Sequence, residues 1–328
     1  MKRKQFVHTL AGAALTVLAL PAFAQGAANP AASFPSKTIK IVVGYAPGGA
    51  NDILARLVAQ KMQESFGKEV VVENKPSTGA IVGSVAVANA APDGYTLLMG
   101  ASGPIVFNPA LYDKLPYNPV KDLVPVSIVG TFPLVLSVKA DAPFRNVQEL
   151  AAHTKANPDK SNYGSSAASF RLATELLKSK TGLRAEHIPY KGSMESVNAV
   201  ASGQVTLTLV DSGPAVAPIK GGLMKGLAVT SAQRIAALPD VPTMAEQGID
   251  LNIQFWSGLL APAGTPKPIV DKIAAEVQRI VKLPDVRARM AALAIDPAGT
   301  TSEEFARVIA SEIPMWTSVA KSNNIRAD

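Results

Sequence analysis

Cysteine is absent from this chain of 328 residues, and histidine is scarce. The absence of cysteine excludes a disulfide framework and a lipid-modified cysteine. Only His153 and His187 lie beyond the first 24 residues, and neither H-E-x-x-H nor a D-x-D cluster occurs. Because transition-metal sites are built from such ligands, we expect no metal site and no cofactor.

Long apolar segments are also missing. A basic start at residues 2–4 and an apolar run over about residues 10–20 precede Ala22-Phe23-Ala24, which has the small-x-small pattern of a cleavage site. The run is roughly half a dozen residues too short to span a bilayer. We therefore expect a signal peptide over residues 1–24, cleavage after Ala24 and a protein free in the periplasm. The alternative is an uncleaved membrane anchor.

An excess of positive charge is weak, and aromatic residues are few. Without Lys2, Arg3 and Lys4 of the leader, the formal net charge falls from +7 to +4, and the basic residues form no stripe. This balance argues against a nucleic-acid partner. Aromatic residues make up only 5% of the chain, as expected of α/β layers built from small aliphatic side chains.

Strands and helices alternate after a polar leader at 25–34. Apolar spacing predicts helices near 52–66, 82–90, 146–156, 193–202, 266–282, 284–293 and 302–322, with strands between them. Gly67 has the usual position after a helix, and Thr301 three residues before Glu304 fits a capping box. Pro133 is expected to break the extended segment 126–138. The alternation predicts mostly parallel sheets covered on both faces.

Roughly 300 mature residues suggest two domains. The final helices need a sheet to cover, and the first half of the chain has strands left uncovered. We therefore place domain 1 at 35–132 and 252–328, and domain 2 at 133–251. The chain then crosses between the domains near 126–138 and again near 251–262, and two crossings make a hinge.

The loops that follow the strands share glycine, serine, proline, asparagine and aspartate. In open α/β sheets ligands collect at the carboxyl ends of strands. Backbone N–H groups at a helix start hold an anion without a formal positive charge, and glycine lets the backbone come close. Five loops qualify: Tyr45 to Asp52, Ala101 to Ile105, Gly164 to Phe170, Lys191 to Met194, and Asp211 to Pro214.

The first of these loops lies in "IVVGYAPGGANDILARLVAQ", residues 41–60. Gly44 and Gly49 have the spacing of a nucleotide-binding P-loop, but Ala50 and Asn51 stand where that loop needs Lys and Ser or Thr. The dinucleotide pattern G-x-G-x-x-G is absent as well. The alternative to an anion site is a tight turn over residues 47–49 with Asn51 as a helix cap.

Enzymatic interpretations find little support. Ser165 and Ser166 are candidate nucleophiles only with a base nearby, and G-x-S-x-G does not occur. His153 lies in a polar helix, where we expect it to be solvated. His187 lies in a strand, where a packed or surface position is more common than a catalytic one. We expect a receptor and not an enzyme.

Several motifs occur together: "FPSKTIKIVVGYAPGGANDILARLVAQKM", "NAAPDGYTLLMG", "NPALYDKLPYNPVKDLVPVS", "HIPYKGS" and "GLLAPAGTPKPIVDKI". In order and spacing they resemble the Bug family, the periplasmic solute receptors of tripartite tricarboxylate transporters, over nearly all of residues 34–325. The resemblance implies a Venus-flytrap fold of two α/β domains (a type II-like periplasmic binding protein) that grips a small carboxylate between them.

The resemblance also implies ligand-binding residues. The family's first loop falls on Tyr45, Ala46, Pro47, Gly48, Gly49, Ala50, Asn51 and Asp52, its serine loop on residues 164–169, its "PYKGS" on residues 189–193, and its later aspartate on Asp211. One carboxylate would bind the amides of residues 48–50, with Asn51, and a second polar group would bind Ser165, Ser166 and Ser169. Tyr45 would face the apolar part of the ligand or join the core, and Asp52 would brace the turn or cap the helix rather than contact an anion. Ser102 and Tyr190 complete the candidate site.

The serine loop departs from the family pattern. It is about two residues shorter than the usual "SSGxGSxxH", and Arg171 stands where a histidine is common. A shorter loop leaves a larger cleft, and Arg171 either pairs with a carboxylate or lies on the outer face of its helix. Ser212 follows Asp211, in place of the asparagine of the family's "DN" pair.

The leading hypothesis is a monomeric receptor that delivers a small organic acid to the membrane subunits of a tripartite tricarboxylate-type carrier. Two other classes stay open: a sensor that docks on a histidine-kinase ectodomain, and an exported serine hydrolase. Monocarboxylates, dicarboxylates and aromatic acids fit the sequence equally.

Overall fold

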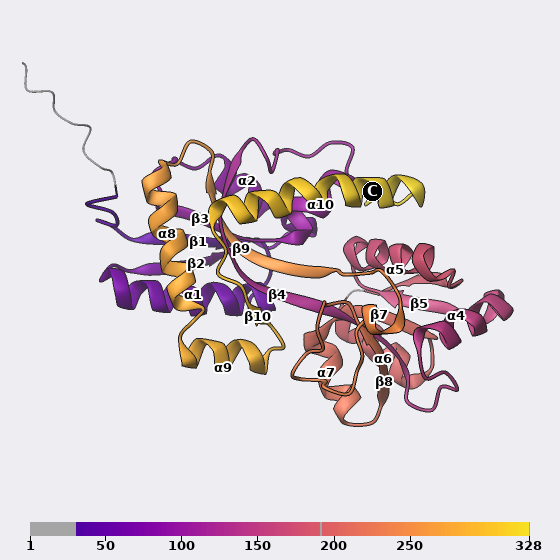
Figure 1. The fold of residues 1–328 in the computed structure, drawn as a ribbon. Helices are drawn as coiled ribbons and strands as arrows, with labels where there is room; N and C mark the ends of the chain where they lie inside the picture. The colour runs from indigo at the N-terminus through magenta and orange to yellow at the C-terminus, as the bar shows by residue number, and fades with distance from the viewer. Residues whose placement is uncertain (1–30, 191, 328) are drawn as a thin grey trace, which may run out of the picture.

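The computed structural model describes residues 31–190 and 192–327. The predicted signal peptide and most of the leader therefore lie outside the described residues. The described chain forms two layered α/β lobes (Figure 1). We call residues 31–133 and 254–327 the first lobe, and residues 134–253 the second lobe. No helix among the described residues has the length and apolar character needed to cross a membrane.

The sheet of the first lobe is built around two crossing strands. Its order is β2 (Val70–Asn74), β1 (Ile39–Val43), β3 (Thr96–Ala101), β9 (Gln254–Pro262), β4 (Leu123–Lys139), and β10 (Asp296–Pro297) also pairs with β4. β1 is parallel to β2 and β3, whereas β9 is antiparallel to both β3 and β4.

β4 continues into the sheet of the second lobe. There it pairs with β8 (Met224–Val229) and β7 (Leu207–Asp211), and β5 (Asn162–Ser165) and β6 (Glu186–Pro189) follow β7. Pro133 pairs with Gln254, and Leu134 pairs with Asp211. The predicted break at Pro133 is therefore wrong: the strand is continuous and changes sheets there. The sheets are also mixed and not mostly parallel, because the chain leaves and returns along adjacent strands.

Helices cover both faces of each sheet. On the first sheet, α1 (Ala50–Phe66), α8 (Lys267–Ile280) and α9 (Pro284–Ala292) bury one face. The other face carries α2 (Ile81–Ala88), η2 (Gly103–Phe107), α3 (Asn108–Leu111) and α10 (Ser302–Ser322). On the second sheet, α4 (Val147–Ala156) and α5 (Ala168–Thr181) lie opposite α6 (Ser193–Ser202) and α7 (Ser212–Lys220). Short helical turns occur at Thr78–Ala80, Pro158–Lys160 and Ala245–Gln247.

Two predicted helix ends are confirmed. α1 ends at Gly67, whose φ of 62° is left-handed, and its amide bonds to the carbonyl of Gln63. This conformation suits glycine because it has no Cβ. α10 begins with the full capping box of Thr301 and Glu304.

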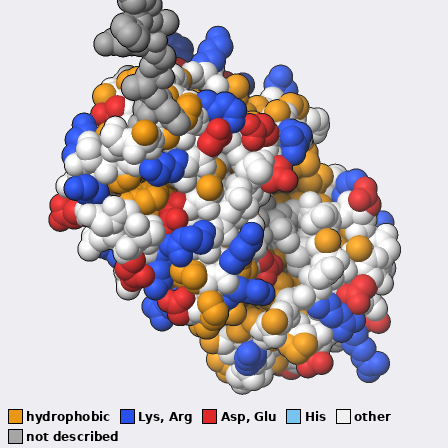
Figure 2. Space-filling model, turned by 60° about the vertical axis from the view of Figure 1, so that its left-hand side comes forward, with side chains coloured by type: hydrophobic (Ala, Val, Ile, Leu, Met, Phe, Trp, Pro, Cys, Tyr) orange, Lys and Arg blue, Asp and Glu red, His pale blue; other side chains and the backbone are white. Residues whose placement is uncertain are grey.

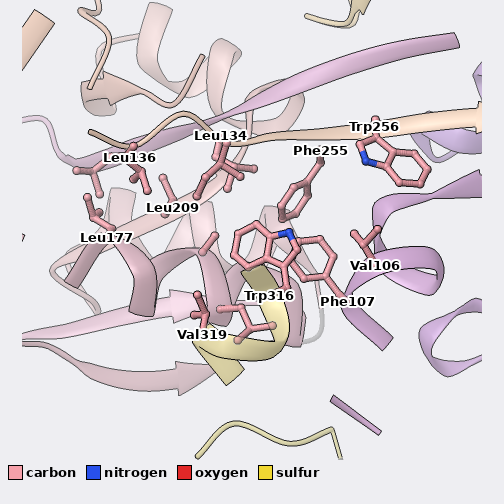
Figure 3. Close-up of a cluster of buried hydrophobic side chains, with 14 of the residues drawn as sticks. Val106, Phe107, Leu134, Leu136, Leu177, Leu209, Phe255, Trp256, Trp316 and Val319 are labelled. Atoms are coloured by element: carbon pink, nitrogen blue, oxygen red, sulfur yellow. The ribbon is translucent and has the colours of Figure 1, made fainter. Parts of the chain in front are cut away.

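A cluster of aromatic side chains connects the two lobes. Phe107 of η2 packs against Trp316 of α10 and Phe255 of β9, with ring centroids 4.6 and 5.0 Å apart (Figure 3). Phe170, in the first turn of α5, lies 5.2 Å from Phe255. α10 also extends from the first lobe to contact α5 (Figure 1). Apolar packing therefore joins the lobes on the side of the sheets that carries α10 and α5.

α10 also carries a carboxyl group in an apolar position. Trp256 of β9 donates its indole N–H to Glu312 at 3.0 Å. Burial raises the pKa of Glu312 to about 7, against the opposing effect of this hydrogen bond. Because the folded state binds this proton more tightly than the unfolded state does, the stabilising contribution is present below pH 4.5 and is lost as the pH rises through 7.

Replacing Glu312 by Gln should remove this pH dependence. Between pH 5 and pH 8 we expect the wild-type protein to lose about 2 kcal/mol of unfolding free energy that the Glu312→Gln variant retains. Urea unfolding at both pH values measures the difference, with the exposed Glu186→Gln as the control. Parallel pH profiles for wild type and Glu312→Gln would contradict the assignment.

Candidate interlobe binding site

A cavity of about 550 Å³ lies between the lobes and is lined by residues from both. Its size is typical of pockets that bind small molecules. The first lobe contributes Tyr45, Thr78, Gly79, Gly103, Phe107, Asn108, Leu111, Tyr112, Arg326 and Ala327. The second lobe contributes residues 165–169, Arg171, His187, Pro189 and Tyr190. Among these lining residues there are two arginines, one histidine and no carboxylate.

The serine loop forms the wall of the second lobe. β5 ends at Ser165, and α5 begins at Ala168 after an extended Ala167. Parallel pairing of β5 with β6 brings His187 beside this loop, and the Ser165 hydroxyl lies 2.8 Å from His187 Nε2. Tyr190 packs on Gly164, where a Cβ atom would stand 3.0 Å from the tyrosine ring. The absence of a side chain at residue 164 therefore admits the ring to the cavity wall.

Arg171 lies in the first turn of α5 and lines the cavity. Its Nε atom is buried, and none of the described residues accepts a hydrogen bond from it. Burial lowers the pKa of His187, and the positive charges of Arg171 and Lys178 lower it further, against the effect of Glu175. At neutral pH the wall therefore combines a neutral imidazole with a guanidinium that has a donor to spare, which suits an anion.

The wall of the first lobe is aromatic and is held by buried hydrogen bonds. Tyr45 lies over Gly103, where a Cβ atom would stand 2.8 Å from the tyrosine hydroxyl. Asn108 donates to the carbonyl of Gly79 at 2.8 Å and fixes the loop that precedes α2. Burial raises the pKa of Tyr45, so its hydroxyl stays protonated across the physiological range. This wall offers ring faces and neutral polar groups.

Of the turn after β1, only Tyr45 lines the cavity. Residues 46–50 are exposed at the surface. Asp52 folds back on this turn: it accepts hydrogen bonds from the Gly48 amide at 2.9 Å, from Arg56 at 3.0 Å and from Asn74 at 2.9 Å. Burial raises its pKa, but these bonds outweigh burial and the pKa is lowered. The predicted brace is confirmed. Since the Gly48 amide is already engaged, the amides of Gly49 and Ala50 are the ones left for an anion.

Three more predicted residues stand back from the cavity lining. Asn51 is buried and accepts a hydrogen bond from Ser257 of β9. The α1 N-cap is Gly49, so the alternative of Asn51 as a cap is wrong. Ser102 is buried at the end of β3, one residue before the lining Gly103. Asp211 lies behind Ser193, whose hydroxyl donates to it at 2.9 Å.

Sequence reasoning missed a large part of the lining. His187 was assigned a packed or surface position, although its alternation with Ile188 in β6 is compatible with a place beside β5. The other missed residues are Thr78, Gly79, Phe107, Asn108, Leu111, Tyr112, Arg326 and Ala327. They come from the turn before α2, from η2 and α3, and from the chain end, where no motif marks them.

The family follows from comparison with known proteins. The sequence model of the tripartite tricarboxylate transporter family receptor, TctC, matches residues 54–325. The chain belongs to this family. A UPF0065 protein encoded in the tcbD–tcbE intergenic region of Pseudomonas sp. (strain P51) is 35% identical over 90% of this chain and 89% of its own length. Protein BugT of Bordetella pertussis is 32% identical over 95% and 98%.

Solved structures of TctC-type proteins share the fold. Rpa4515 of R. palustris with adipate is 31% identical, with a TM-score of 0.78, over 89% of this chain and 99% of its own. MatC from Rhodopseudomonas palustris with bound malate is 31% identical, with a TM-score of 0.74, over 87% and 99%. The predicted two-domain binding-protein fold is confirmed, and TctC-family proteins are periplasmic solute-binding proteins.

The Asp52 brace in this TctC-type chain is open to a direct test. Replacing Asp52 by Ala removes a buried carboxylate that accepts hydrogen bonds from Gly48, Arg56 and Asn74, so we expect a loss of about 1–3 kcal/mol of unfolding free energy. Asp113→Ala, at an exposed ion pair of the same lobe, should change stability by less than about 1 kcal/mol. Urea unfolding at pH 7 measures both variants, and equal stability of Asp52→Ala and wild type would show that the turn holds without its brace.

Proposed function

We propose that this chain is an exported receptor that captures a small carboxylate between its lobes and delivers it to a tripartite tricarboxylate-type membrane carrier. The observation that carries the proposal is the cavity shared by both lobes, whose lining includes Arg171, Arg326 and His187 but no carboxylate. Arg326 pairs with Asp113, which lies outside the lining. None of the described residues forms a salt bridge with Arg171, so the positive charge that attracts an anion is that of Arg171. Signal peptide cleavage after Ala24 would release the receptor into the periplasm.

The two walls divide the work of binding. The guanidinium of Arg171, with its free buried donor, and the hydroxyls of Ser165, Ser166 and Ser169 form a polar end. Tyr45, Phe107, Tyr112 and Tyr190 supply apolar surface for the body of the ligand. The adipate and malate carried by the two related structures are small dicarboxylates, and the lining described here suits the same class.

The α1 amino terminus would join the site on closure. The amides of Gly49 and Ala50 lie at the start of a 17-residue helix, where the helix dipole favours a negative charge. We propose that the lobes rotate about residues 133–134 of β4 and 253–254, beside β9, and so bring the ligand against this turn. A ligand that contacts both lobes binds the closed state better and shifts the population toward it.

One feature favours a second function in part. The Ser165 hydroxyl and His187 Nε2 are within hydrogen-bond distance, as in a nucleophile and its base. In a catalytic triad a carboxylate orients the other nitrogen of the histidine. Among the described residues no carboxylate accepts a hydrogen bond from His187, so we assign the pair to binding.

Binding of small acids to the wild-type protein tests the receptor function. A panel of succinate, malate, adipate, citrate, benzoate and terephthalate should contain at least one ligand that raises the melting temperature by several degrees, since a ligand at 100 times its Kd adds about 2.7 kcal/mol. For that acid, Arg171→Ala should weaken binding by about 10- to 100-fold in isothermal titration, because a charge-assisted hydrogen bond contributes roughly 1.5–3 kcal/mol.

The control is Arg184→Ala, which removes the same charge from an exposed position of the second lobe and should leave affinity unchanged. If no acid of the panel raises the melting temperature, the receptor function is contradicted. Undiminished binding by Arg171→Ala would remove Arg171 from the site. Hydrolysis of p-nitrophenyl acetate that disappears in Ser165→Ala would favour the hydrolase instead.

A further inference from the structure

A chain of hydrogen bonds leads from the cavity into the second lobe. The hydroxyl of Ser166, which lines the cavity, lies 3.2 Å from the hydroxyl of Ser193 at the start of α6. Ser193 in turn donates to Asp211 Oδ1, at the end of β7, at 2.9 Å. Neither Ser193 nor Asp211 lines the cavity. Three segments of the lobe therefore meet behind a single cavity-lining hydroxyl.

The direction of these bonds follows from the number of hydrogens. An ionised carboxylate only accepts hydrogen bonds, and a serine hydroxyl has one hydrogen to donate and two lone pairs. Ser193 donates its only hydroxyl hydrogen to Asp211, so Ser166 has to be the donor in the bond between the two hydroxyls. The hydrogen of Ser166 is then directed away from the cavity. What Ser166 presents to a ligand is an oxygen acceptor.

We propose that Ser193 and Asp211 are positioning residues that make Ser166 a hydrogen-bond acceptor, and that the ligand therefore carries a hydroxyl or amino donor besides its carboxylate. The inference rests on the proposed function and narrows its ligand class from simple carboxylates to hydroxy or amino acids. A carboxylate oxygen placed against Ser166 would meet another acceptor, whereas a hydroxyl there makes a hydrogen bond.

The same wall holds a separate place for the anionic group. The buried Nε of Arg171 has no partner among the described residues, so the donor that a carboxylate requires lies on α5. Ser166 lies in the loop that precedes this helix, and its partner Ser193 lies on α6, on the other side of the sheet. Donor and acceptor are thus supplied by different elements of one wall. This arrangement can bind the carboxylate and the hydroxyl or amino group of one ligand at the same time.

Matched pairs of acids that differ by one hydroxyl test the proposal. The pairs are malate (each enantiomer) with succinate, and 3-hydroxyadipate with adipate. Each acid is titrated calorimetrically into the full mature protein. Burial raises the pKa of Asp211, against the hydrogen bond that it accepts from Ser193, so the titrations are made at both pH 8 and pH 9, which favour the ionised carboxylate. For at least one pair the wild-type protein should bind the hydroxylated acid about tenfold more tightly, the size expected of one hydrogen bond that a site is built to accept.

Ser193→Ala removes the partner that accepts from Ser166 and frees its hydrogen, so the preference for the hydroxylated acid should fall to about one. Ser193→Thr keeps the hydroxyl and should restore the preference. Ser202→Ala, at the other end of the same helix, is the matched control and should behave as wild type. If Ser193→Ala does not fold, Ser166→Ala serves in its place: it should weaken binding of the hydroxylated acid more than binding of its partner, so that the ratio of the two affinities falls to about one.

The ratio of the two affinities separates positioning from a merely structural role, because a distorted wall weakens both acids alike. Equal weakening of both acids in Ser193→Ala, or the absence of a preference in the wild-type protein for every pair that binds, overturns this inference and leaves the proposed function intact. If none of these acids and none of the earlier panel binds, the proposed function fails and this inference fails with it.

Discussion

The antiparallel pairing of β4 with β9 is the interaction on which the rest of the structure depends. These two strands lie side by side from Leu123 with Pro262 to Pro133 with Gln254, and beyond that point β4 belongs to the second sheet. Every covalent connection between the lobes runs through this ribbon. In the described chain only these two strands pass between the lobes, so the connection is narrower than the layered lobes on either side and is where a hinge motion would occur. The cavity opens beside this point.

The aromatic cluster and the cavity share a boundary. Phe107 packs against Phe255 and Trp316 and also lines the cavity. Phe170, beside Phe255, lies one residue before Arg171. The apolar contact between the lobes and the candidate binding residues are thus parts of one structure, so a change in the angle between the lobes alters both. On the face in Figure 2, lysine and arginine side chains are interspersed with aspartate and glutamate.

Local sequence patterns predicted the helices and strands, but they predicted only part of the candidate site. The capping box at Thr301 and the end of α1 at Gly67 depend on neighbouring residues, which the sequence displays directly. The serine loop was found because a helix start after a strand is also a local feature. His187 was missed because its role depends on which strand lies beside β6. Arg326 reaches the cavity from the chain end, and the engagement of the Gly48 amide depends on how Asp52 folds back. Such long-range placements have no signature within a short window.

The position of β9 in the first sheet has a consequence for the order in which the molecule can be completed. β9 lies between β3 and β4, yet it follows both of them by more than a hundred residues. Along the chain the elements of the second lobe all precede β9, so without β9 the facing edges of β3 and β4 are unpaired. Open strand edges invite pairing with other chains. A chain that ended near residue 253 would thus have a complete second lobe beside an incomplete first sheet with two unpaired strand edges.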